Sequence, residues 1–155
     1  MTEKLPDQLR DRLRLVFVGT AAGQRSADLG HYYAGPGNRF WRTIHEVGIT
    51  PRRYEPREFT ELLKLGIGLT DVCKLGVGMD HQALKFPVDI AAFREKMLIY
   101  RPSTIAFTAT LHERICRRAP VEGRKLEIER TPIPILAINV RLQLRKCRRD
   151  QPFAA

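Results

Sequence analysis

The sequence has few cysteines and no long apolar run. Its cysteines are Cys73, Cys116 and Cys147, which lie far apart and match no metal-ligand or redox spacing. No apolar stretch approaches the ~20 residues that a membrane-spanning helix needs. Residues 1–14 are too charged for a signal peptide. We therefore expect a cytoplasmic protein with reduced thiols, no metal site and no membrane partner.

Acidic residues and glycine-rich phosphate motifs are also scarce. Residues 19–23, GTAAG, are not a GxGxxG motif, and neither GxxxxGKS nor GxxxxGKT occurs anywhere in the chain. Lys and Arg number 27 against 17 Asp and Glu, which gives a net charge of +10 and a pI near 10.1. This surplus favours a polyanionic partner such as nucleic acid. A basic protein without such a partner is the alternative.

Apolar strands and helices alternate along the 155 residues, with no repeat and no second domain. We expect helices at residues 38–48, 59–65, 89–102 and 110–119, and strands at residues 14–19, 66–73, 103–109 and within 125–138. Residues 19–30 and 74–87 are predicted to be loops. Pro132 and Pro134 place part of the last strand region at a sheet edge. The alternation predicts an α/β fold with a mainly parallel sheet.

Rings and glycines gather in residues 31–41, HYYAGPGNRFW, shortly after the first predicted strand. Open α/β sheets bind ligands at the carboxyl ends of their strands, so this segment and residues 19–23 are the first candidates for a site. Backbone amides of a small-residue loop can approach a carbonyl or phosphate oxygen. We expect Tyr33 to stack on a planar ligand, whereas Phe40 and Trp41 fit the apolar stripe of a helix and belong to the core.

Residues 19–41 resemble the signature segment of the uracil-DNA glycosylase superfamily. The similarity is greatest to the mismatch-specific uracil/thymine-DNA glycosylase branch. That branch has Gly-x-Asn-Pro-Gly, then Ser-Ala, then an aromatic-Ala-His-Pro-x-Asn-Arg-Phe-Trp run. The matching positions here are Gly19, Gly23, Ser26, Ala27, Tyr33, Ala34, Pro36, Asn38, Arg39, Phe40 and Trp41. Residues 66–71 are similar to the family's Gly-Val-Thr segment.

The resemblance implies a three-layer α/β/α sandwich with a short, mainly parallel central sheet. It implies hydrolysis of the N-glycosidic bond of uracil, or of a related deaminated or mismatched base, in DNA. The product is an abasic site, and no cofactor takes part. The partner would be uracil-containing or mismatched DNA, and we expect a monomer. The substrate-binding residues would be Gly19, Thr20, Ala21, Ala22, Gly23, Ser26, Tyr33 and Asn38, with Tyr33 stacked on the flipped base and Asn38 also expected to cap a helix.

Two positions depart from the family pattern inside the proposed pocket. The water-orienting Asn of the family is replaced by Ala21, and the following Pro by Ala22. An alanine methyl group cannot orient water, so another polar group is needed. We expect the catalytic residues to be Asp28, as an anion that positions water, and His31. A solvated loop acid and an ordinary loop histidine are the alternatives.

The C-terminal part departs further from the family. Residues 1–138 are expected to form the glycosylase-like domain, and residues 139–155 an atypical basic tail. The family's late Pro-Ser-x-Ser-Gly loop and final helix have no match here. Our hypothesis is that residues from about 136 onward are frameshifted, because a shifted frame of residues 136–141 permits Leu-Pro-Ser-Thr-Ser-Gly. Sequencing the locus tests this. The alternative is a solvated basic tail.

Arginines near the predicted pocket are candidates for contacts to DNA phosphates. We expect this role for Arg25 and Arg39, and also for Arg42, Arg117 and Arg118, whereas Arg52 and Arg53 fit a solvated pair equally well. Two other functions stay open. One is a lesion-binding protein of the same fold without turnover. The other is a small-molecule nucleotide-binding α/β protein that uses residues 19–23 as a phosphate nest.

Overall fold

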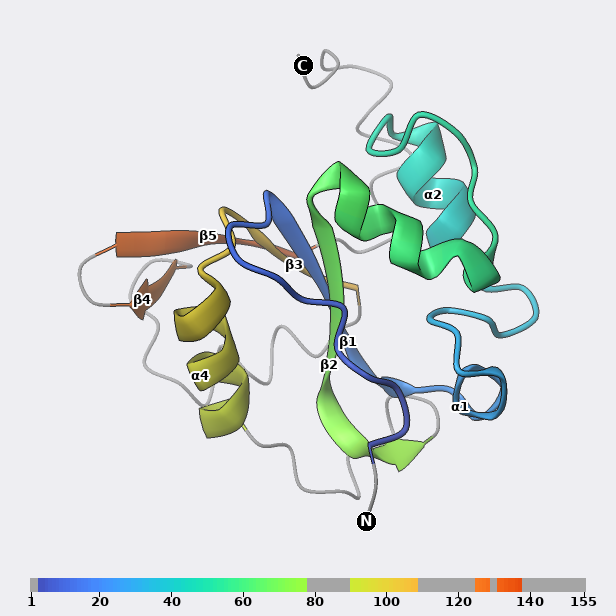
Figure 1. Ribbon diagram of the computed structural model, residues 1–155, viewed down its shortest axis with the longest axis horizontal. Helices are drawn as coiled ribbons and strands as arrows, with labels where there is room; N and C mark the ends of the chain where they lie inside the picture. Colours follow the sequence, from blue (N-terminus) through green and yellow to red (C-terminus); the bar gives the residue numbers. More distant parts are fainter. Residues whose placement is uncertain (1–2, 78–89, 109–124, 129–130, 138–155) are drawn as a thin grey trace.

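The computed structural model describes residues 3–77, 90–108, 125–128 and 131–137 (Figure 1). Among these residues no helix is long and apolar enough to cross a membrane. The predicted helix at 110–119, with Arg117 and Arg118, lies outside the described residues, and so does the predicted tail at 139–155.

A five-stranded sheet forms the centre of the molecule. Its strands are β1 (Leu15–Ala22), β2 (Ile67–Val77), β3 (Ile105–Phe107), β4 (Lys125–Ile128) and β5 (Thr131–Ala137). They lie in the order β2-β1-β3-β5-β4. Neighbouring strands from β2 to β5 are parallel, and only β4 is antiparallel to its neighbour. The predicted, mainly parallel sheet is confirmed.

Each face of the sheet is covered by helical segments, which makes three layers. On one face Val16, Val18 and Ile105 pack with Phe93 and Met97 of α4 (Ile90–Tyr100). The intervening residues of the same strands face the opposite side, because side chains alternate along a strand. There Phe17 and Ala106 pack with α2 (Phe40–Glu46) and with the 3-10 helix η1 (Pro56–Leu65). Figure 1 shows α4 and the α2–η1 pair on opposite sides of the strands.

The first strand is longer than predicted. Thr20, Ala21 and Ala22 belong to β1, and a short helix, α1 (Gln24–Leu29), follows Gly23 directly. The prediction of a loop over residues 19–30 was therefore wrong. The reason is tertiary: β2 runs on to Val77 and supplies pairing partners for these small residues, so local composition does not decide their conformation.

Residues 74–77 were also predicted to be a loop and belong to β2 instead. The prolines of β5 lie where the sequence predicts them. Pro132 and Pro134 pair only with β4, whereas β3 pairs with residues 135–137. Because a proline has no N–H to donate to a second neighbouring strand, it is tolerated in this half of β5.

The turn before α2 follows the predicted chemistry. The Asn38 N–H donates to the Gly35 carbonyl over 3.1 Å, and Gly37 has φ +74°. Pro36 at the second position and Gly37 at the third fit a type II turn. The Asn38 side-chain oxygen then accepts the Phe40 N–H at 2.9 Å, so its predicted capping contact is confirmed.

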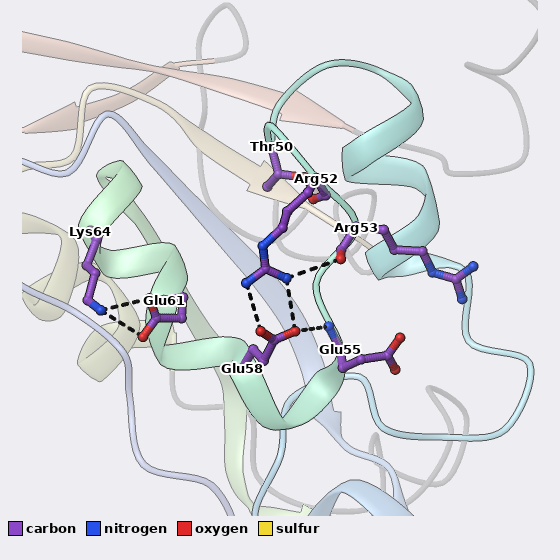
Figure 2. A network of polar contacts seen from close by, with 7 residues as sticks. All are labelled: Thr50, Arg52, Arg53, Glu55, Glu58, Glu61 and Lys64. Carbon is purple, nitrogen blue, oxygen red and sulfur yellow. Dashed lines mark hydrogen bonds and ion pairs between the residues drawn. The ribbon is translucent and has the colours of Figure 1, made fainter.

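A polar network joins the segment before η1 to the first turn of that helix (Figure 2). Glu58 accepts two hydrogen bonds from Arg52, at 2.8 and 3.2 Å, and a third from the Glu55 N–H at 2.9 Å. The guanidinium of Arg52 also lies 3.8 Å from the centre of the Tyr54 ring. Arg52 is therefore held at the protein surface. Arg52 and Arg53 are both exposed, and their role, as phosphate contacts or as a solvated pair, stays a prediction.

Candidate active site

Polar groups meet at the carboxyl ends of β1 and β3. The half-buried Tyr33 hydroxyl shares a 3.2 Å hydrogen bond with the hydroxyl of Thr108, which follows β3 directly. The Thr108 hydroxyl in turn donates to the Val18 carbonyl of β1 over 3.3 Å. A threonine hydroxyl has one proton, so Tyr33 is the donor in the first bond. The ring of Tyr33 is thereby fixed at the carboxyl ends of the central strands, which is where open α/β sheets bind ligands.

Tyr33 is held in an unusual backbone conformation. Its φ is +55°, in the left-handed region that favours glycine. Its ring stacks on Phe40, with ring centres 3.9 Å apart and planes tilted by 20°. A non-glycine residue in such a conformation costs about 1–3 kcal/mol and persists only where surrounding contacts impose it. This strain is consistent with a ring placed for function.

The contacts that impose it come from both flanks of Tyr33. On one flank the Ala34 N–H donates to the buried Ser26 hydroxyl at 3.0 Å. On the other flank the indole N–H of Trp41 donates to the Tyr32 carbonyl at 3.2 Å. Ser26 was predicted to bind substrate, and the contact that the structure gives it is this structural one. Trp41 and Phe40 are core residues, as predicted.

Asp71 is the site residue that sequence reasoning missed. In the parallel register Asp71 of β2 is the partner of Gly19 of β1, so both face the Tyr33 side of the sheet. A Cβ atom at Gly19 would clash with the Asp71 carboxylate and would lie 3.4 Å from the Tyr33 hydroxyl. The signal was present in the sequence, as an acid inside the otherwise apolar run of residues 66–73.

The Asp71 carboxyl group is 6% exposed. Burial raises its pKa to about 6, and the nearby charge of Asp7 raises it as well, whereas Lys74 and Lys96 oppose the shift. None of the causes of this pKa shift is a hydrogen bond from the described part of the chain. Tyr32, which lies close by, has a raised pKa for the same main reason, burial.

The two lysines near Asp71 are engaged by another acid. The Asp7 carboxylate forms ion pairs with Lys74, at 2.8 Å, and with Lys96, at 2.5 Å. Burial alone would raise the pKa of Asp7, but hydrogen bonds from Lys74, Lys96 and Thr70 lower it overall. Asp7 is thus the paired acid of this region, and Asp71 is an acid to which no residue within the described ranges forms an ion pair.

The other residues predicted to line the pocket differ in the face of the sheet that they occupy and in their burial. Ala21 is half-buried and is the next residue of β1 on the same face as Gly19. Ala22 is buried in the core, and Gly23 precedes α1. Thr20 has the opposite parity and faces the α4 side. Its buried hydroxyl oxygen has no hydrogen-bond partner among the described residues.

The residues predicted to be catalytic have other neighbours than Gly19 and Asp71 in the contacts of the described residues. Asp28 is exposed on α1, and its carboxylate accepts a 2.7 Å hydrogen bond from the Gln24 side chain. The half-buried His31 ring lies 6.0 Å from the Phe59 ring of η1. Among the described residues no hydrogen bond, ion pair or ring contact joins Asp28 to His31, and their catalytic roles stay predictions.

The predicted phosphate-binding arginines that belong to the described residues lie at the surface. Arg25 on α1 and Arg39 at the start of α2 are exposed. Arg42 is exposed as well but forms a 2.6 Å ion pair with Glu46. Within the described ranges, no three or more His, Cys, Asp or Glu side chains gather as a metal ion would require.

Most of the chain matches the model of one protein family. The family model described as Uracil DNA glycosylase superfamily matches residues 6–140. The matched range includes every strand, the Tyr33 segment and Asp71.

Proposed function

Because the chain belongs to the uracil DNA glycosylase superfamily, we propose that it is a DNA repair glycosylase of the mismatch-specific uracil/thymine branch. The reaction is hydrolysis of the N-glycosidic bond of uracil, or of a related deaminated or mismatched base, and its product is an abasic site. The observation that carries this proposal is the family match over residues 6–140. The net charge of +10 supports DNA as the partner.

Tyr33 has the properties that a base platform needs. A base inside a duplex is out of reach, so the target must be turned out of the helix and held in a pocket. The Tyr33 ring is already stacked on Phe40 and hydrogen-bonded to Thr108. Little ordering is then needed when a base arrives, and stacking on such a ring contributes about 1–3 kcal/mol per base. Ala21, the next residue of β1 on the same face as Gly19, is small as well.

The exposed arginines account for the sequence-independent part of binding. Arg25 and Arg39 belong to the two helical segments that flank the Tyr33 loop in sequence, α1 and α2. Contacts of this kind position DNA without reading its sequence. They release counterions, so the affinity for DNA should fall steeply as salt is raised.

One observation favours a second function, binding without turnover. Ala21 has no polar group to hold a water molecule, and exposed Asp28 is hydrogen-bonded to Gln24. A protein with the pocket but without a water-positioning group would bind uracil-containing DNA and leave it intact. Product formation separates the two functions.

The test is incubation of the purified protein with an end-labelled oligonucleotide that carries one uracil, followed by alkali. Single strands, U:A duplexes and U:G duplexes are compared, with the thymine-containing strand as the undamaged control. The proposal expects a cleaved band from at least one uracil substrate, and a band reduced about 10–100-fold with Tyr33→Ala. Retention of the uracil strand in a gel shift, without any cleavage, would support the second function instead.

A further inference from the structure

We propose that Asp71 is a catalytic residue of this reaction, whose carboxylate takes a proton from the water that attacks the deoxyribose. The inference rests on the proposed glycosylase function and adds to it the group that activates water. It assigns a role to a residue of β2, whereas the predicted candidates Asp28 and His31 come from the segment that follows β1.

The first argument is placement. The register Gly19↔Asp71 sets the carboxylate beside a residue without a side chain, so the carboxylate occupies the space over the Gly19 backbone. The Tyr33 hydroxyl borders the same space. The next residue of β1 on this face is Ala21, which is small and half-buried. On this side Asp71 is therefore followed along the face by a methyl group and not by a bulky side chain.

The second argument is the absence of a structural partner. A buried carboxylate is normally retained because it is paired or hydrogen-bonded. In the described residues the charged groups that face Asp71 are Asp7 of the N-terminal segment, Lys74 of β2 and Lys96 of α4. Both lysines are bound to Asp7, and the Tyr33 hydroxyl donates to Thr108. In the part of the chain that the structure describes, no hydrogen bond or ion pair to Asp71 thus supports a role in holding the fold together.

The third argument is chemical. The Asp71 carboxylate accepts one proton from water as the water oxygen forms a bond to C1′ of the deoxyribose. The bond between C1′ and the base nitrogen breaks, and its electron pair leaves with the base as an anion. Asp71 is then a neutral acid, and it returns to the carboxylate when its proton passes to solvent or to the departed base. Atoms and charge balance without any further reactant.

The protonation of Asp71 predicts a pH profile. The group works only as a carboxylate, so activity should be full above its pKa and fall about tenfold per pH unit below it. Burial places that pKa near 6, with Asp7 raising it and Lys74 and Lys96 opposing. An exposed aspartate titrates near 3.9, which would leave activity unchanged between pH 5 and pH 8.

The experiment measures single-turnover cleavage of a uracil oligonucleotide by the wild-type chain and by Asp71→Asn, from pH 5 to pH 8. Asp71→Asn keeps the shape of the side chain and removes its charge. The expected result is a loss of at least 100-fold in rate at pH 7.5 and loss of the pH dependence near 6, with DNA affinity within about threefold of wild type. Asp11→Asn, an exposed aspartate at the far end of the sheet, is the matched control and should change neither.

The outcomes separate the two proposals. If the wild-type chain cleaves and Asp71→Asn keeps the same rate and the same pH profile, the assignment of Asp71 is overturned while the glycosylase function stands. If Asp28→Asn abolishes cleavage and Asp71→Asn does not, Asp28 is the group that activates the attacking water, and the assignment of Asp71 is again overturned. If the wild-type chain does not cleave any uracil substrate, the function itself fails and the assignment falls with it.

Discussion

Replacing Asp71 should stabilise the protein, and by an amount that depends on pH. The pKa of this carboxyl lies near 6 in the folded chain against an ordinary value of 3.8, mainly because burial disfavours its charge. The folded state therefore holds the proton more tightly than the unfolded state. The ionised form costs stability at full strength above about pH 6, and the cost vanishes below pH 3.8. At 1.36 kcal/mol per pKa unit this is about 3 kcal/mol at pH 7.5.

Asp71→Asn removes the charge at every pH, so the stability of the variant relative to wild type should rise by about 2.4 kcal/mol from pH 4 to pH 7.5. The measurement is urea denaturation of both proteins at several pH values, with the difference in unfolding free energy plotted against pH. A pH-independent difference in unfolding free energy between the two proteins is not part of this prediction, because it reflects the burial of the amide group in the variant. A difference that stays flat across this range would show that the carboxyl is not perturbed, and the reasoning from burial would be refuted.

Three further outcomes follow from the same geometry. Gly19→Ala should destabilise the fold by about 1–3 kcal/mol through the clash with Asp71. Gly23→Ala has nothing within 4 Å of the new methyl group and should cost less than about 1 kcal/mol, because Gly23 is the N-cap of α1 and alanine is the weaker cap residue; equal costs would contradict the contact. Tyr33→Phe should lose about 0.5–1.5 kcal/mol of stability with its hydrogen bond, yet keep cleavage within about threefold, since the ring remains; a loss comparable to Tyr33→Ala would assign the chemistry to the hydroxyl. DNA affinity, measured by fluorescence anisotropy, should fall linearly on logarithmic axes with salt, and Arg39→Ala should reduce that slope by about one; an unchanged slope would remove Arg39 from the interface.

Much of the fold could be predicted from local patterns. The apolar spacing of Phe40, Trp41 and Ile44 predicts the buried face of α2, and all three are buried. The Pro36-Gly37 pair predicts the turn before it, and Asn38 the cap. These features depend on residues close in sequence, which is why sequence reasoning reaches them.

The errors come from contacts between distant residues. The loop-like composition of Thr20, Ala21 and Ala22 gave no hint that β2 would extend to Val77 and pair with them. Nothing local shows that the Ala34 N–H would donate to the Ser26 hydroxyl, and the substrate contact that the resemblance implies for Ser26 stays a prediction.

Asp71 was overlooked for the same reason. Its place in an apolar run marks it as buried, but only the register with β1 shows that it faces Gly19 and Tyr33. A single sequence does not specify register between strands that are about fifty residues apart. The candidate segment could thus be singled out from the sequence, and its role in binding stays a prediction, whereas the pairing of Asp71 with Gly19 could not be foreseen.

The most direct test of the account is the cleavage assay on a uracil-containing oligonucleotide with the wild-type chain at pH 7.5. The account predicts an alkali-labile site at the uracil position and free uracil in the supernatant, in equal amounts. A folded protein that leaves every uracil substrate intact would contradict it.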